Sequence, residues 1–173
     1  MPRPVRVPAP RPGGREWLNG PLVWAIDETH QPMYLLPRDC PRILVWPTAM
    51  TTAADREQWF AGTSCRMRAF IEAAWRDRLA SATLHRYEFA DAAFADLADA
   101  GMWVSRTPVA PIAHTEVRDL VGELRAQDVD LVVLDSLVPL RELWSTSLQT
   151  SGIRLRNAAG WAAWPTVAPV AFR

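Results

Sequence analysis

Polar and titratable side chains are concentrated in one short segment, residues 27–42. Apolar runs flank this segment on both sides, at residues 22–26 and 42–46. Sites in proteins are often built on loops at one end of a sheet, so we expect a site here if the chain has one. The polar side chains of the segment are Asp27, Glu28, His30, Tyr34, Arg38, Asp39, Cys40 and Arg42.

Arg38 lies in a loop that Pro37 and Pro41 constrain. A rigid loop holds a guanidinium group in place at low entropic cost, and its fork of N–H donors suits a phosphate or a carboxylate. Tyr34, Asp39 and Arg42 are the neighbouring candidates for ligand binding. An Arg-Asp-Cys-Pro loop is more often a structural ion pair beside a buried thiol, and that alternative stays open.

Two other residues of the segment have side chains that can take part in catalysis. His30 follows Asp27 and Glu28, so it could move a proton, although a cap or surface histidine is the plainer interpretation. Cys40 lies between Arg38 and Arg42, whose charges would lower its thiol pKa. No histidine is placed beside Cys40 by the sequence. A hydrolase that uses Cys40 or His30 is therefore a further alternative.

A second candidate site lies on a predicted strand at residues 83–89. Side chains alternate along a strand, so His85 and Tyr87 share one face, while Arg86 and Glu88 share the other. A carboxylate such as Glu88 can act as a general base or orient a substrate hydroxyl. The alternative is a half-exposed strand on which Arg86 and Glu88 form a surface pair.

Composition excludes several classes of protein. All basic residues are Arg, so lysine-dependent chemistry, including that of a Walker loop, is ruled out. The formal net charge is zero, which argues against general nucleic-acid binding. No glycine-rich phosphate motif and no zinc-ligand spacing occurs, and we expect no metal site. Two cysteines without a CxxC pair, and no membrane-length apolar run, predict a cytoplasmic protein without membrane contact.

Hydrophobic periodicity and turn residues predict the elements that position these side chains. We expect a short helical turn near Pro32 that ends before Pro37, and a helix over 64–79 whose apolar stripe faces the core. The run 131–134 predicts a strand buried on both faces. The other expected strands are 22–26, 42–46, 83–89, 102–106 and 153–156, and the other expected helices are 52–60, 117–124 and 137–148.

The domain organisation follows from where this periodicity begins and ends. Residues 1–20 are rich in Pro and Arg and predict an irregular arm. Residues 21–157 predict one globular domain of the α+β class, with a small mixed or antiparallel sheet of short strands and several amphipathic helices. Residues 158–173 predict an irregular C-terminal tail.

Three runs of the sequence resemble a bacterial family of unknown function. They are Val23–Arg42, Gly101–Arg106 and Ser151–Asn157, and the resemblance extends over roughly residues 2–157. Longer members of that family begin with a His-Phe-Ser-Glu segment, which would precede Met1 here. The resemblance therefore implies either a late start or a missing first strand.

Tyr34-Leu35-Leu36-Pro37-Arg38 is also similar to a Tyr-Phe-x-Pro-Arg run of DNA-modifying toxins with the ADP-ribosyltransferase fold. That similarity implies that Arg38 contacts NAD, the substrate of those proteins. Their reaction also needs a glutamate, and we assign that role first to Glu88 and then to Glu28.

The leading hypothesis is therefore an NAD-dependent ADP-ribosyltransferase-like protein. In it Glu88 and His30 are the catalytic candidates, and Arg38, Tyr34, Arg42 and Asp39 are the ligand-binding candidates. NAD is the candidate substrate, and no resident cofactor is assigned. The alternative is a non-enzymatic module that binds a small-molecule, nucleotide or protein partner. An exposed cluster of Trp17, Trp161 and Trp164 would favour this alternative.

Overall fold

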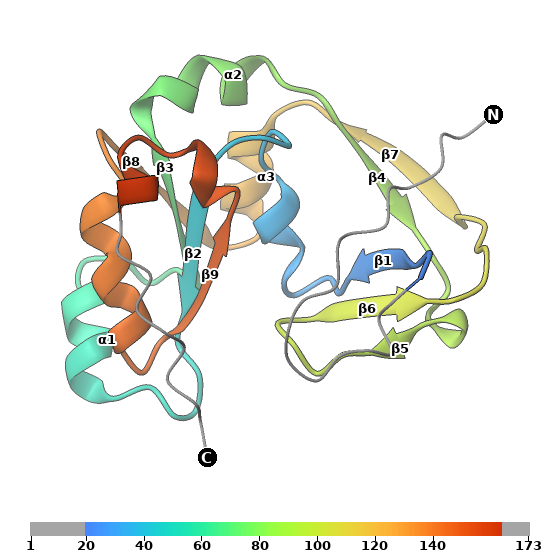
Figure 1. Cartoon of the computed structure of the whole chain (residues 1–173), viewed down its shortest axis with the longest axis horizontal. Helices are drawn as coiled ribbons and strands as arrows, with labels where there is room; N and C mark the ends of the chain where they lie inside the picture. The colour runs from blue at the N-terminus through green and yellow to red at the C-terminus, as the bar shows by residue number, and fades with distance from the viewer. Residues whose placement is uncertain (1–19, 164–173) are drawn as a thin grey trace. The chain divides into compact units, whose positions relative to one another are not determined.

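The computed structural model describes residues 20–163 of the 173-residue chain, and their secondary structure is α+β as the sequence predicts (Figure 1). Contacts between Cα atoms divide the described residues into two compact units. Unit 1 contains residues 20–31 and 85–116, and unit 2 contains residues 32–84 and 117–163. The prediction of one globular domain over 21–157 stays a prediction.

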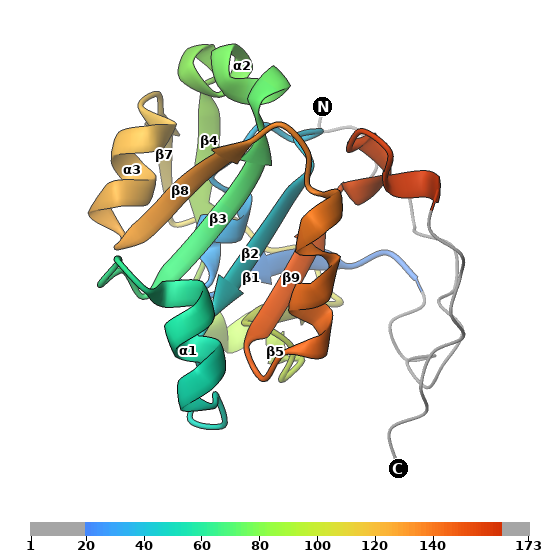
Figure 2. The same ribbon diagram turned by 90° about the vertical axis from the view of Figure 1, so that its left-hand side faces the viewer.

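Unit 2 is built on a four-stranded mixed sheet in the order β8-β3-β2-β9. The strands are β2 (Arg42–Trp46), β3 (Met67–Glu72), β8 (Val129–Leu134) and β9 (Gln149–Ile153). β3 runs parallel to β8 and antiparallel to β2, and β9 runs antiparallel to β2 (Figure 2). The two central strands are buried on both faces, so their sequences are apolar without a clean alternation.

Helical segments cover both faces of this sheet. In Figure 1, α1 (Ala53–Phe60) and a 3₁₀ helix (Val138–Ser145) lie on one side, and α3 (Leu120–Ala126) lies on the other. A further helix, α2 (Arg76–Ser81), follows β3 and a 3₁₀ turn (Ala73–Trp75). The core between the sheet and the 3₁₀ helix consists of Ile43, Val45, Phe60, Phe70, Leu137, Leu140, Leu143, Leu148 and Ala158.

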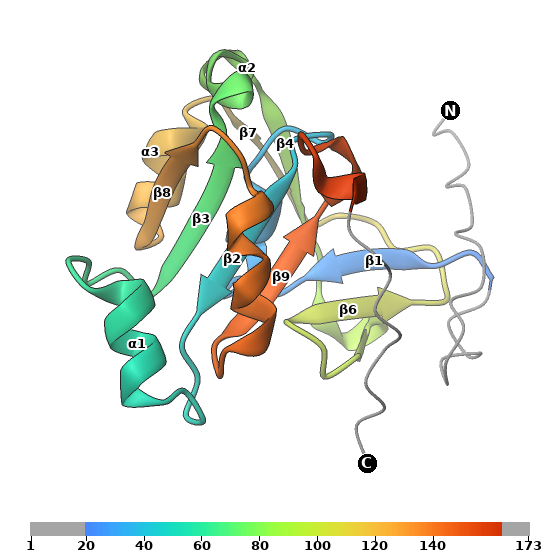
Figure 3. The ribbon, with the colours of Figure 1, turned by 60° about the vertical axis from the view of Figure 1, so that its left-hand side comes forward.

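α1 begins as its sequence predicts. The Thr52 side chain accepts a hydrogen bond from the Asp55 backbone N–H, which satisfies one of the free donors of the first turn. The Asp55 carboxylate in turn accepts hydrogen bonds from the Ser147 side chain and backbone. The contact between Asp55 and Ser147 connects the start of α1 to the turn before β9. Figure 3 shows this turn near the lower end of the 3₁₀ helix.

Unit 1 contains two small sheets. β1 (Val23–Ile26), β6 (Met102–Ser105) and β5 (Ala95–Asp96) form an antiparallel sheet in the order β1-β6-β5. β4 (Leu84–Glu88) and β7 (Ala113–Val117) form a two-stranded ribbon. The predicted strands at 22–26, 83–89 and 102–106 are thereby confirmed.

The helix predicted over 64–79 is wrong in its first half. Residues 67–72 form β3, and only Arg76–Ser81 is α-helical. Met67, Phe70 and Ile71 fit a helical stripe, but a central strand buried on both faces also accepts apolar residues at such spacing. Arg68, which lies outside that apolar stripe, bonds Asp130 on the adjacent β8 at 2.9 Å.

Two other strand predictions need correction. β8 lies at the edge of its sheet, and five of its six residues are only half-buried, so it is not buried on both faces. The last strand, predicted over 153–156, instead spans Gln149–Ile153, so the two ranges share only Ile153. Arg154 takes a left-handed conformation with φ 56°, which breaks the extended chain, and a 3₁₀ turn follows at Leu155–Asn157.

The ends of the chain and the membrane prediction can be tested only in part. Residues 1–19 and 164–173 lie outside the described residues. Within the predicted tail, Trp161–Ala163 form a 3₁₀ turn rather than irregular chain. None of the helices within residues 20–163 has the length and apolar character that a membrane span requires.

Candidate functional site

β1 and β2, the strands on either side of the polar segment 27–42, belong to different sheets and different units. The prediction that the segment lies at one end of a single sheet is therefore wrong. Asp27, Glu28 and His30 belong to unit 1, whereas Tyr34 and all later residues of the segment belong to unit 2. The sequence does not predict that β1 and β2 belong to different sheets, because the residues of two short apolar strands do not indicate whether the strands pair.

Arg42 organises the loop in unit 2. Its side chain is buried, with 3% of its surface exposed. The Nε atom donates to the Met33 carbonyl at 2.9 Å, and Nη1 donates to the carbonyls of Pro37 and Cys40 at 3.2 and 3.0 Å. One guanidinium group thus joins three points of residues 33–40, which fixes the shape of the loop.

Burial lowers the pKa of Arg42 to about 10, because a charge is poorly solvated there, and the nearby charge of Arg154 acts in the same direction. The group still carries its charge at neutral pH. Its Cζ atom lies 5.9 Å from the centre of the Tyr34 ring, and the Tyr34 side chain is 46% exposed. Tyr34 therefore offers ring surface to solvent with a cation beside it.

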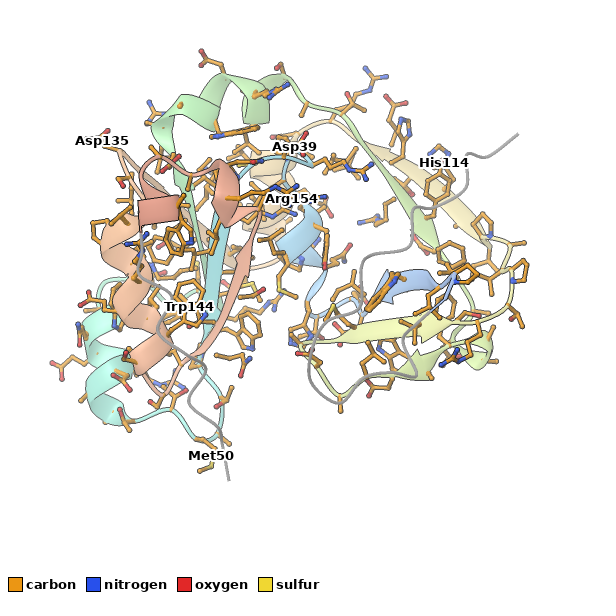
Figure 4. All side chains as sticks on the ribbon, viewed as in Figure 1. Asp39, Met50, His114, Asp135, Trp144 and Arg154 are labelled. Carbon is orange, nitrogen blue, oxygen red and sulfur yellow. The ribbon has the colours of Figure 1, made fainter. Side chains whose placement is uncertain are left out.

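A second set of contacts braces the exposed part of the loop. Arg154 Nε donates to the Arg38 carbonyl at 3.3 Å, and Asn157 Nδ2 donates to the Asp39 carbonyl at 2.7 Å. Both donors come from the turn that follows β9, so the structure brings the residues of 154–157 to the loop of 37–42. Figure 4 labels Asp39 and Arg154, which lie at the same end of the unit 2 sheet.

Positive charge exceeds negative charge around this loop. Within residues 20–163, the guanidinium groups of Arg38, Arg42 and Arg154 have no carboxylate within ion-pair distance. Arg38 and Asp39 are both exposed and do not pair with each other. In the structural alternative, the Arg–Asp ion pair is therefore wrong, whereas the buried thiol is confirmed at Cys40, and an arrangement open to an anion remains.

Cys40 does not have the environment of a nucleophile. Its side chain is fully buried, and the thiol lies 3.5 Å from the Pro41 carbonyl. Burial raises the pKa of the Cys40 thiol to about 11, and the opposing effect of Arg42 is smaller. The expectation that flanking arginines lower this pKa is wrong, because desolvation of the thiol outweighs the attraction of the buried Arg42 charge.

Glu72 is a buried carboxylate that the sequence did not single out. It ends β3, is 4% exposed, and accepts hydrogen bonds from the backbone N–H groups of Ala159 and Leu137. Its charge is close enough to Cys40 to raise the thiol pKa further. We missed it because Glu72 lies outside the apolar stripe of the helix that we predicted over 64–79.

In unit 1, His30 and Asp27 form a close pair. His30 Nδ1 lies 2.8 and 3.0 Å from the two Asp27 carboxylate oxygens, and the His30 backbone N–H donates to the same carboxylate at 2.7 Å. The Asp27 backbone N–H donates to the Gly101 carbonyl at 2.8 Å. A Cβ atom at Gly101 would lie 2.3 Å from His30 Nδ1, so only glycine fits beside the pair.

This pairing has a chemical consequence for His30. A carboxylate at Nδ1 favours the tautomer that carries its proton there, which leaves the basic lone pair on Nε2. The arrangement therefore suits His30 to accept a proton. Glu28 is exposed beside the pair.

Glu88 lies on β4 of unit 1 and is exposed. Its carboxylate is 3.8 Å from Arg86 Nε, so the predicted surface pair of Arg86 and Glu88 is confirmed. Arg38 and Glu88 belong to different units. The prediction that they act in one site stays a prediction, as do the individual roles assigned to the candidate residues.

Comparison with curated proteins and with solved structures finds no match. A family model does match, and it covers residues 3–158, most of the chain. These residues include the Arg38 loop, the Asp27–His30 pair and the strands that carry them. The chain belongs to that family, a family of unknown function (DUF6886).

Proposed function

We propose that the loop of residues 34–42 binds a phosphate-bearing ligand, and that this ligand is the NAD of an ADP-ribosyltransferase-like reaction. The observation that carries the proposal is the braced and unneutralised group of Arg38, Arg42 and Arg154. Cationic groups carried on a braced loop, without carboxylate partners among the described residues, attract a pyrophosphate.

Each ligand-binding residue has a distinct part in this proposal. Arg38, exposed at the tip of the braced loop, contacts a phosphate or a ribose hydroxyl. Tyr34 offers its exposed ring for stacking on a base. Arg42 has its Nε and Nη1 donors committed to carbonyl groups, so it acts by shaping the loop and by its charge rather than by direct contact.

The chemistry would be transfer of ADP-ribose. The bond between nicotinamide and ribose breaks, nicotinamide leaves with the electron pair, and a nucleophile of the acceptor forms the new bond to the sugar. A carboxylate stabilises the oxocarbenium-like intermediate and takes the proton of the nucleophile. Glu88 is the proposed carboxylate, and His30, held by Asp27, is the proposed alternative proton acceptor.

Thermal unfolding with NAD tests the binding step. Ligand at about a hundredfold its dissociation constant adds about 2.7 kcal/mol of stability. We expect NAD and ADP-ribose to raise the melting temperature, and Arg38→Ala to abolish the rise. Arg56→Ala, a change of an exposed arginine on α1, is the matched control. Absence of any rise with the unmodified chain would contradict the proposal.

Release of nicotinamide tests the catalytic step separately. The proposal expects Glu88→Gln to abolish release while the NAD-dependent rise in melting temperature persists. Glu57→Gln, at an exposed position of α1, is the control. Stabilisation without any nicotinamide release would favour the second candidate, a non-enzymatic binding module.

One observation favours that second candidate. Trp144 is 48% exposed and its ring meets Trp161 edge-on, with centroids 6.0 Å apart. Exposed aromatic residues are common at protein interfaces. Trp17 and Trp164, the other members of the predicted cluster, lie outside the described residues. A hydrolase that uses Cys40 is withdrawn because the thiol is fully buried and this burial raises its pKa, whereas one that uses His30 remains compatible with the Asp27 contact.

A further inference from the structure

Two exposed histidines face each other across the ribbon of unit 1. His85 lies on β4 and His114 on β7, and His85 Nδ1 is 3.0 Å from His114 Nε2. Figure 4 labels His114 on its strand. Nothing in the proposed NAD reaction uses this pair, so it needs a separate explanation.

The rings lie nearly side by side rather than face to face. Their centres are 5.2 Å apart and their planes differ by only 24°, while the two nitrogens are much closer than the centres. The nitrogens therefore point toward each other, as in a hydrogen bond in which one ring donates its N–H and the other accepts. The Tyr87 ring packs against the His114 ring, with centres 4.7 Å apart and an angle of 19° between the two planes. This contact helps to hold the orientation of the His114 ring.

The separation of the nitrogens matches that of adjacent ligands on one metal ion. Two nitrogens about 2.1 Å from an ion lie about 3.0 Å apart at a right angle and about 3.4 Å apart at a tetrahedral angle. Because the nitrogens point at each other, each lone pair must turn by about 45° from the line between them to meet an ion at a right angle, or by about 35° at a tetrahedral angle, while the nitrogens stay near their present 3.0 Å separation. Both side chains are exposed, so such rotations meet water rather than a packed core, but the His114 ring must also move against the Tyr87 ring.

We propose that His85 and His114 form a two-histidine site for a divalent transition metal, with Cu²⁺ bound more tightly than Ni²⁺ or Zn²⁺. Neutral imidazole is a preferred ligand of these ions, and their affinities follow this order at a given nitrogen site. Within residues 20–163, no group of three or more potential ligands gathers around one point. Water therefore completes the coordination, and the site exchanges metal with solvent.

The test uses the complete chain, whose three histidines all lie in the described part. Titration with Cu²⁺, Ni²⁺ and Zn²⁺ salts against a coloured chelator gives the affinity and the number of ions bound. We expect one ion per chain, and a loss of at least about tenfold in affinity for His85→Ala and for His114→Ala. His30→Gln is the control and should retain the affinity, because His30 contacts Asp27 instead.

Two further results decide the matter. Coordination requires neutral imidazole, so binding should weaken as the pH falls from about 7.5 to about 5.5. Zn²⁺ should also shift the ring nuclear magnetic resonances of His85 and His114 but leave those of His30 unchanged. Equal affinity in His85→Ala and the unmodified chain, or no binding by the unmodified chain, would overturn the proposal and leave the pair as a hydrogen bond only.

Discussion

Replacement of Arg42 by methionine tests how the Arg38 loop is held. Methionine retains much of the apolar volume of the side chain but removes the donors to the carbonyls of Met33, Pro37 and Cys40. Hydrogen bonds from a charged donor contribute about 1.5–3 kcal/mol each. The Pro37 carbonyl also accepts from the Cys40 N–H, so its loss is partly compensated.

Burial of the charge opposes this stabilisation. The fall of the Arg42 pKa from 12.5 to about 10 corresponds to about 3 kcal/mol of cost to the charged form, which the variant would no longer bear. The carbonyl contacts outweigh that cost, and we expect a net loss of about 3 kcal/mol in the free energy of unfolding. For a chain of this size, the melting temperature would fall by about 6–12 °C.

Urea unfolding followed by circular dichroism measures this loss, with Arg56→Met on the exposed surface of α1 as the matched control. Hydrogen exchange at Arg38 and Asp39 should also accelerate, since their loop would lose its internal brace. A change in stability below about 0.5 kcal/mol, the range of an ordinary surface substitution, would refute the reasoning.

Three other predictions follow from single contacts. Gly101→Ala should lower the melting temperature, because its φ of 72° and its close neighbours leave no place for a Cβ atom; an unchanged melting temperature would contradict this. A thiol reagent at pH 8 should modify the half-exposed Cys65 in the native chain and leave Cys40 intact until unfolding, and rapid labelling of both would be the contrary result. Hydrogen bonds from Ser147 lower the pKa of Asp55, so this contact stabilises the fold above the unfolded pKa of about 4 and is lost as the pH falls through the lower folded value. Acid unfolding of Asp55→Asn should therefore depend less on pH in that range than that of the unmodified chain.

The fold could be predicted from the sequence where local signals agreed with the tertiary structure. The apolar run of β2 ends before Pro47, so β2 has the bounds that the sequence predicts. Thr52 caps α1, so this helix begins where the sequence predicts. The failure at β3 has the opposite cause. A strand buried on both faces lacks alternation, and its apolar residues happened to fit a helical stripe.

The candidate site was predictable only as a segment. Composition and proline spacing pointed to Arg38 and its neighbours, but not to the turn of residues 154–157 that braces them. That turn arises from the left-handed conformation of Arg154, which no local residue preference indicates. Glu72 was missed for a related reason, since its buried carboxylate is held by the backbone of Leu137 and Ala159, which are distant from it in the sequence.

The binding of NAD to the Arg38 loop is the central claim, and calorimetric titration measures it most directly. NAD, ADP-ribose and pyrophosphate would each be titrated into the unmodified chain, Arg38→Ala and Arg56→Ala. The proposal predicts binding of NAD and ADP-ribose by the unmodified chain and Arg56→Ala, weaker binding of pyrophosphate, and an affinity at least about tenfold lower for Arg38→Ala. Equal affinities in all three proteins, or no binding of any of the three ligands, would contradict it.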